Sequence, residues 1–209
     1  TNWAIVPVKN LDHSKSRLSD VLSVDARREL ICNLLTRTLM MLNGSEFIEN
    51  TIVISNDVSV LQLADKQGVC TVQEDSPSDL NSALQQATLV TMTYGAQGLL
   101  VLPADLPLLT REDVEKIIAT EYSDRLVRIV PDQHGVGTNA LFIRPPGMLR
   151  YKFGKDSLSN HKEEAKRVRA ELHVYRLSNV EFDIDDPDDL RRLNNVAVNT
   201  QQQEVQRHG

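Results

Sequence analysis

Aromatic side chains are scarce in this chain, since Phe, Trp and Tyr make up 4% of its 209 residues. Proteins that bind single-stranded nucleic acids use aromatic side chains as stacking platforms for bases, so this scarcity argues against that class. The net charge of −6 argues against a sequence-independent hold on a phosphate backbone, although it leaves room for a local basic pocket. We therefore expect no nucleic-acid partner.

Cysteine and long apolar runs are scarce as well. Cys32 and Cys70 are the two cysteines, and neither belongs to a CxxC motif or a Cys/His cluster, which argues against structural zinc. We interpret both as small buried hydrophobic side chains in a reducing compartment. No apolar run reaches the roughly 18 residues of a membrane helix, and the first residues carry no basic-then-apolar signal pattern. These absences predict a cytoplasmic protein without a membrane partner.

Three common catalytic motifs are missing: the GxxxxGK[ST] of a P-loop, the GxGxxG of a dinucleotide fold and the GxSxG of a hydrolase elbow. The five histidines show no metal-ligand spacing. These absences argue against kinase-type, dehydrogenase and hydrolase functions.

Hydrophobic residues (41%) and charged residues (25%) are present in the proportions of a globular protein, and the length suits one core. Apolar patterns alternate between strand and helix periods. The expected strands cover 3–8, 51–55, 69–73, 98–102, 126–130, 139–143, 173–177 and 181–184, and the expected helices cover 24–42, 58–66, 79–94, 111–120, 157–170 and 187–198. This order predicts an α/β fold with βαβ units, a mainly parallel sheet and helices on both faces. We expect residues 1–198 to form one domain and the Gln-rich residues 199–209 to form a tail without stable structure.

Asp105 follows the apolar run 98–102, which is typical of a strand buried on both faces. It lies in the sequence Pro-Ala-Asp-Leu-Pro at 103–107. Ligands of open parallel sheets bind beyond the carboxyl ends of the strands, so Asp105 is placed to face that crevice. The alternative is an aspartate that only shapes a turn between two prolines.

A basic, hydroxyl-rich loop follows the first expected strand, at residues 9–19. Lys9, Lys15, Arg17 and three serine hydroxyls suit a triphosphate, because cations neutralise its charge while hydroxyl and backbone N–H groups bind its oxygens. The alternative is an ordinary solvated loop.

Six acids lie within residues 181–190. Asp186 fits a helix N-cap before Pro187 at N1, and the next two acids complement the helix dipole. Asp183 and Asp185 are not explained in this way. They share one face of the expected strand, so their carboxylates converge, and a hard divalent cation usually offsets such repulsion. The alternative is a solvated acidic strand end.

Two turns offer donors for a small anion. At 135–139 two glycines allow a close backbone approach, and the Thr138 hydroxyl and the Asn139 amide can donate. At 153–157 Gly154 precedes Ser157, where the free N–H groups of an expected helix attract a phosphate or carboxylate. The alternative at Ser157 is a plain capped turn.

Together these motifs resemble one family. The matching segments are Ile5 to Lys9, Ser14 to Leu18, Leu80-Asn81, Ala83-Leu84, 103–107, 135–141, Phe153-Gly154, Ser157, His161, Asp183 to Asp185, Pro187 and Asp189-Leu190. They resemble the 2-phospho-L-lactate guanylyltransferases of the nucleotide-diphospho-sugar transferase superfamily, to which the molybdenum-cofactor guanylyltransferases are related. The resemblance implies a Rossmann-like α/β domain.

The resemblance also implies a role for each matching position. It places the nucleotide at Pro7, Val8, Lys9, Lys15, Arg17, Asn81, Pro103 and Asp105, and makes Lys9, Lys15, Arg17 and Asp105 catalytic. It places the phosphorylated three-carbon acid at Thr138, Asn139, Gly154, Ser157 and His161. It places Mg²⁺ at Asp105, Asp183 and Asp185. Asp79 departs from the glycine that many relatives have before Leu-Asn.

The activity that the resemblance implies is the transfer of GMP from GTP to 2-phospho-L-lactate, or in some members to phosphoenolpyruvate, with release of pyrophosphate. It further implies a homodimer that acts in the synthesis of the deazaflavin coenzyme factor 420. The residues alone do not identify the nucleotide base that is preferred or the phosphorylated acid that accepts GMP. Two other functions also stay open: a related nucleotidyltransferase for a sugar phosphate or molybdopterin, which the missing LxGGxSxRxGxxK loop disfavours, and a non-catalytic nucleotide sensor.

Overall fold

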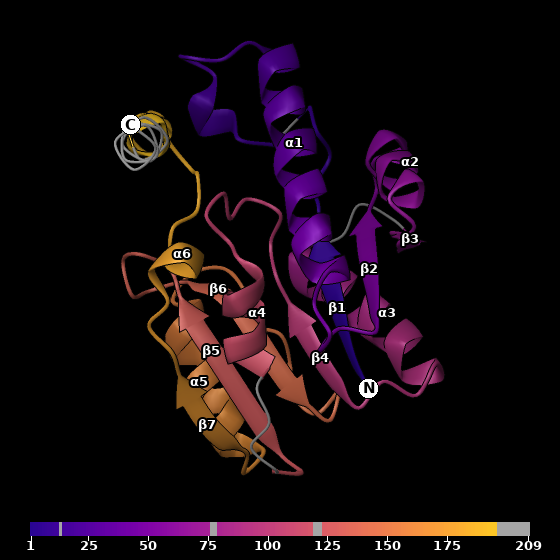
Figure 1. The fold of residues 1–209 in the computed structure, drawn as a ribbon. Coiled ribbons are helices and arrows are strands. Elements are labelled where there is room, and N and C mark those ends of the chain that lie inside the picture. The colour runs from indigo at the N-terminus through magenta and orange to yellow at the C-terminus, as the bar shows by residue number, and fades with distance from the viewer. Residues whose placement is uncertain (13, 76–78, 119–122, 196–209) are drawn as a thin grey trace, which may run out of the picture.

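The computed structural model describes residues 1–195 except 13, 76–78 and 119–122 (Figure 1). The expected tail at 199–209 lies outside the described residues, as do positions 196–198 of the last expected helix. No helix in the described part is long and apolar enough to cross a membrane.

A seven-stranded sheet is the centre of the described part, in the order β3-β2-β1-β4-β6-β5-β7. Its strands are β1 (Asn2–Pro7), β2 (Asn50–Ser55), β3 (Cys70–Gln73), β4 (Gly98–Val101), β5 (Leu126–Pro131), β6 (Thr138–Arg144) and β7 (Glu171–Val174). The pairing is parallel except at β6, which runs antiparallel to both β4 and β5. This confirms the expected mainly parallel, mixed sheet.

Helices pack on both faces of the sheet, as expected (Figure 1). They are α1 (Val24–Asn43), α2 (Val58–Lys66), α3 (Leu80–Thr93), α4 (Arg111–Ile118), α5 (Ser157–Arg167) and α6 (Ser178–Glu181), with a short 3₁₀ turn η1 (Ser16–Leu18) and helical residues 187–195. The helices α1, α2, α4 and α6 contribute to the core on one face, and α3 and α5 contribute to the core on the other.

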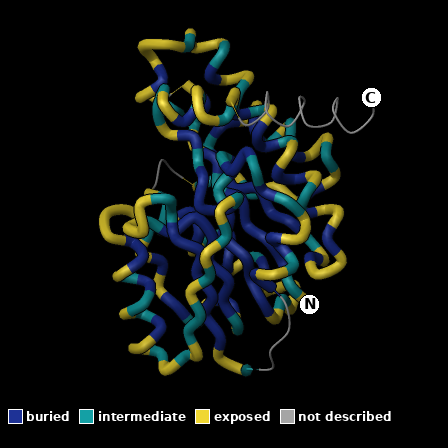
Figure 2. The backbone as a smooth tube through the Cα atoms, turned by 60° about the vertical axis from the view of Figure 1, so that its left-hand side comes forward, coloured by how far each residue is buried: buried dark blue, intermediate teal, exposed yellow. Residues whose placement is uncertain are grey.

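Strand β1 shows why the sheet is buried on both sides. Ala4 and Val6 face one core, and Ile5 faces the other. All three are fully buried, which is typical of a central parallel strand whose residues are apolar without alternation. Figure 2 shows the same arrangement, with the buried strands inside and the exposed residues on the outer helices and loops.

Two expected strands and the expected burial of the cysteines differ from the structure. Residues 181–184 do not form a strand, because Glu181 is the last residue of α6 and Ile184 N bonds to the carbonyl of Asp105 in a loop. The expected strand at 173–177 lies earlier, as β7. Cys70 is exposed because β3 is an edge strand with one half-buried position. Cys32 lies in α1 and is half-buried against the core that α1 helps to form.

Candidate functional site

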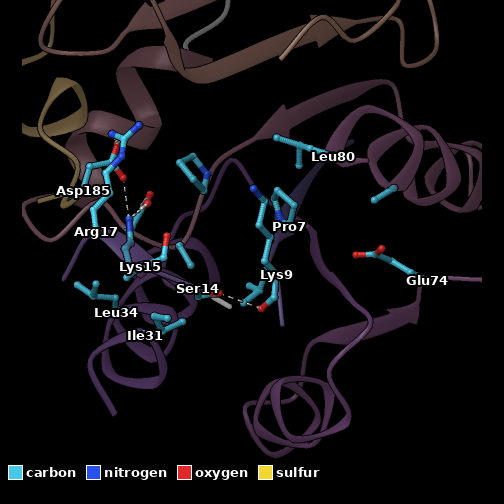
Figure 3. A pocket seen from close by; sticks show the side chains of 16 residues that line it. Pro7, Lys9, Ser14, Lys15, Arg17, Ile31, Leu34, Glu74, Leu80 and Asp185 are labelled. Carbon is cyan, nitrogen blue, oxygen red and sulfur yellow. Dashed lines mark hydrogen bonds and ion pairs between the residues drawn. The ribbon is translucent and has the colours of Figure 1, made fainter. Parts of the chain in front are cut away.

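The site lies at the carboxyl ends of the parallel strands, where β1 has β2 on one side and β4 on the other. At such a switch point the loops that leave neighbouring strands diverge and open a crevice. A cavity of about 440 Å³ occupies it (Figure 3). Its lining residues are Pro7, Val8, Lys9, Ser14, Lys15, Ser16, Arg17, Ile31, Leu34, Glu74, Leu80, Ala83, Pro103, Ala104, Asp105 and Asp185.

Three carboxylates converge at one end of this cavity and are called the acid cluster below. One oxygen from each of Asp105, Asp183 and Asp185 lies within 4.8 Å of the others. Ile184 is fully buried between the two C-terminal acids, and its N–H donates to the Asp105 carbonyl at 3.2 Å. The extended segment 182–185 therefore keeps both acids on one side without belonging to a strand.

The electrostatics of the acid cluster favour a bound cation. Burial first, and then the charges of Asp105 and Asp185, raise the pKa of Asp183 to about 6. Carboxylate oxygens are the ligands that Mg²⁺ prefers, so the donor set fits the ion that the family resemblance implies.

Lys15 supplies a cation to the acid cluster. Its ammonium pairs with Asp105 and lies 3.1 Å from Asp185 Oδ1, while Arg17 Nη1 lies 4.0 Å from Asp185 Oδ2. Burial lowers the pKa of Lys15, but the two carboxylates raise it by more, so the net shift is upward. Lys15 therefore stays charged and acts as the counter-ion of the acids.

The loop that carries Lys15 is held from two sides. Lys15 has a left-handed backbone (φ 53°), and its carbonyl accepts from Leu18 N at 2.9 Å and from Arg27 Nη1 at 3.5 Å. Earlier in the loop, the buried Asp57 accepts from Leu11 N at 3.0 Å while capping α2. These bonds fix the path of the basic loop over the cavity.

A capping box shapes the other side of the acid cluster. Asp186 Oδ1 accepts from Asp189 N at 3.1 Å, and Asp189 Oδ2 accepts in return from Asp186 N at 3.2 Å and from Asp185 N at 2.9 Å. Burial favours a higher pKa for Asp189, but the hydrogen bonds from Asp185 N, Gln133 and Asp186 N bring it below its usual value. Asp189 therefore positions the Asp185 backbone from behind.

Most of the predicted nucleotide residues come together at the cavity. Its lining includes Pro7, Val8, Lys9, Lys15, Arg17, Pro103 and Asp105. Asn81 is not among the lining residues, because both ends of its amide pair with the Phe153 backbone, at 3.1 Å to the carbonyl and 2.8 Å from the N–H. Asp79 takes the N-cap of α3, which explains an acid at that position. The role of Asn81 toward the nucleoside stays a prediction.

The predicted acceptor residues are not among the lining residues of the cavity, and one of them contacts the acid cluster. Asn139 Nδ2 donates to Asp183 Oδ1 at 3.3 Å, which links β6 to the acids. Ser157 is the buried first residue of α5, and Gly154 has a backbone (φ +117°) that favours glycine. Thr138 contacts His161 at 3.0 Å. Their role in binding an acceptor stays a prediction.

His161 is a fully buried, neutral positioning residue. Its Nε2 accepts from Lys152 N at 3.0 Å, so the proton lies on Nδ1 and is donated to Thr138 Oγ1. Burial lowers the pKa of His161 to about 4, in spite of the charge of Glu164. The bond leaves the hydrogen of the Thr138 hydroxyl available to donate elsewhere.

Several cavity residues were missed by reasoning from the sequence. Glu74 comes directly after β3, so the same strand-end rule that singled out Asp105 could have found it. Ile31 and Leu34 of α1 carry no such signal, because they are ordinary apolar helix positions.

The fold is the one that Rossmann-like nucleotidyltransferases share. A nucleotidyl transferase from Methanothermobacter superposes with a TM-score of 0.68 over 95% of this chain and 98% of its own, at 14% identity. The chain belongs to the CofC-like guanylyl transferase family, whose sequence model matches residues 2–207. This confirms the family that the motifs indicate.

Named relatives of known sequence agree with this membership. The phosphoenolpyruvate guanylyltransferase of Rubrobacter xylanophilus is 38% identical over 191 residues, which are 91% of this chain and 92% of that protein. The 2-phospho-L-lactate guanylyltransferase of Methanocaldococcus infernus is 29% identical over 189 residues, which are 90% of this chain and 82% of that protein.

Proposed function

We propose that this chain transfers GMP from GTP to a phosphorylated three-carbon acid and releases pyrophosphate. Family membership and the names of the relatives support guanylyl transfer. The observation that carries the proposal is the meeting of the acid cluster with Lys15 and Arg17 at one end of the cavity. That arrangement suits a nucleotide triphosphate together with its divalent cation.

We propose Mg²⁺ as the cofactor, held by Asp105, Asp183 and Asp185. When bound there, it would polarise phosphate oxygens and offset the charge that develops during transfer. Lys15 and Arg17 line the cavity next to the acids and would contact the phosphates that leave as pyrophosphate.

The nucleophile needs no general base from the protein. The attacking group would be an oxygen of the acceptor phosphate, which is largely dianionic at neutral pH because its second pKa is about 6. The protein's contribution is then positioning of the two phosphates and stabilisation of charge. The neutral state of His161 fits this scheme, since that side chain orients Thr138 and takes up no proton near pH 7.

We propose phosphoenolpyruvate as the preferred acceptor, with 2-phospho-L-lactate as the second candidate. Relatives named for phosphoenolpyruvate reach 38% identity, as in Rubrobacter xylanophilus, whereas the Methanocaldococcus infernus relative named for phospholactate is 29% identical. A methyl or methylene difference is worth only about 1–3 kcal/mol of pocket fit, so the two acids must be compared directly.

The test supplies the purified protein with Mg²⁺, GTP and either acid, and measures pyrophosphate and the guanylylated product by mass spectrometry. Asp105→Asn removes a carboxylate of the acid cluster and is expected to abolish nearly all turnover. Asp188→Asn is the matched control, because its exposed carboxylate pairs with Arg191 outside the cluster. Retained turnover in Asp105→Asn contradicts the assignment, and GTP binding without any product indicates a nucleotide sensor.

We also propose, from the family resemblance, a cytoplasmic homodimer that serves the synthesis of the deazaflavin coenzyme factor 420. Light scattering of the purified chain measures the mass directly. A monomer at micromolar concentration contradicts the homodimer.

A further inference from the structure

The cavity carries another acid away from the acid cluster. Glu74 is half-buried and lines the cavity, and its carboxylate points inward on the far side of Pro7 and Lys9 from Asp185 (Figure 3). A carboxylate beside phosphates without a cation between them would be unfavourable, because like charges repel. If the phosphates lie at the Lys15 end, Glu74 faces the part of the ligand that carries hydrogen-bond donors.

The backbone around Glu74 is fixed on both sides. Glu74 N donates to the Ser55 carbonyl at 3.0 Å, which continues the pairing of β3 with β2. From α3, Gln86 donates to the Gln73 carbonyl at 3.0 Å and accepts from Asp75 N at 3.4 Å. Three hydrogen bonds thus hold residues 73–75, so Glu74 is presented to the cavity from a pre-organised position.

The wall next to Glu74 suits a flat, apolar ring. Pro7, Leu80 and Ala83 line the cavity together with Glu74, and they offer apolar surface without competing charge. Ligand sites commonly combine such apolar walls with a few placed polar groups that fix orientation. A nucleotide with its phosphates at Lys15 and Arg17 would extend its base toward this wall.

We propose that Glu74 recognises the base and selects guanine. This inference rests on the proposed function, which places a nucleotide in the cavity. Guanine presents two adjacent donors, N1–H and the N2 amino group, which match the two oxygens of a carboxylate. Adenine has an acceptor at N1, and hypoxanthine lacks the N2 donor. A carboxylate has about four lone-pair sites, so Glu74 can accept both donors alongside the contact that it already makes.

Gln86 acts in this scheme as a positioning residue. It touches the backbone on both sides of Glu74 and is not among the lining residues of the cavity. Its removal by Gln86→Ala is expected to reduce the preference for GTP over ITP while leaving that preference detectable.

The experiment measures the binding of GTP, ITP, XTP and ATP to the wild type and to Glu74→Gln by calorimetry without acceptor, and then their kcat and KM. The wild type is expected to prefer GTP. Glu74→Gln is expected to weaken GTP binding by about 10- to 100-fold, since each charge-assisted bond contributes strongly. Glu74→Gln is also expected to gain affinity for XTP, because the amide can donate to the C2 carbonyl of xanthine and accept from its N1–H.

Glu49→Gln is the control, because it makes the same change in charge at an exposed site before β2, at the opposite edge of the sheet. If Glu74→Gln weakens all four nucleotides equally, or leaves their ratios unchanged, the inference is wrong. If the wild type binds GTP selectively but forms no product, the proposed function is wrong, and the role of Glu74 is still decided by the nucleotide-binding measurements. A wild type that binds no GTP overturns both.

Discussion

Single residues decide the charge balance of the site, and Lys15 shows this most clearly. Its ammonium lies between Asp105 and Asp185, where a divalent cation bound by the acid cluster would also lie. The ammonium offsets carboxylates that would otherwise repel each other. Lys15 and a metal ion would therefore compete for the same carboxylates, and a bound metal ion would release Lys15 toward the phosphates.

Replacing Lys15 with methionine tests this competition. Lys15→Met is expected to bind Mn²⁺ without nucleotide about tenfold more tightly, because the competing charge is gone. Calorimetry or electron paramagnetic resonance measures the affinity. Lys9→Met is the control, because it removes a cation that lines the cavity but is not paired with the acid cluster in the described structure. An unchanged or weaker affinity in Lys15→Met speaks against the competition.

His161 makes a residue-scale prediction about pH. Its pKa is about 4 in the folded protein and about 6.5 when unfolded, so the unfolded chain takes up the proton first as pH falls. His161 therefore contributes stability that is complete above about pH 6.5 and lost by about pH 4, with a total of about 3 kcal/mol. In urea unfolding, His161→Gln should lose less stability than the wild type between pH 7 and pH 4. Equal losses would show that His161 is not the group responsible.

At the scale of elements, loops and caps rather than strands carry the site. The segment 182–185 has no strand partner, and its position depends on the Ile184–Asp105 backbone bond and on the capping box behind it. Asp189 serves two purposes there, since it caps the helical residues 187–195 and holds the N–H of Asp185. The acid cluster and the last helix are thereby coupled.

Asp189→Ala tests this coupling. It leaves two backbone N–H groups without their carboxylate acceptor, so the free energy of unfolding should fall by about 1–2 kcal/mol. Mn²⁺ affinity should fall as well, although Asp189 does not belong to the acid cluster. Asp188→Ala, which removes an exposed first-turn acid, should lower the free energy of unfolding by less than about 1 kcal/mol and leave the Mn²⁺ affinity unchanged. If Asp189→Ala loses stability but keeps full metal affinity, the cap and the acid cluster are not coupled.

At the scale of the whole molecule, the carboxyl-edge rule for parallel sheets explains why much could be predicted from the sequence. The apolar periods along the sequence predict the strands of the sheet. Because Lys15 and Asp105 both follow expected strands, the rule predicts that they lie at one edge of the sheet. The segment 182–185 could not be predicted, because its path depends on the Ile184–Asp105 backbone bond and on packing of Ile184. Pairing of Asn81 with Phe153 is likewise a tertiary contact, with no local signal.

Anomalous diffraction from crystals grown with GTP and with Mn²⁺ in place of Mg²⁺ locates the metal ion of the proposed site. We expect a strong peak within about 2.5 Å of carboxylate oxygens from Asp105, Asp183 and Asp185, with the Lys15 ammonium moved away from them. The metal site is wrong if the peak lies elsewhere, or if GTP binds while Lys15 keeps both of its ion pairs and no metal ion joins the acids.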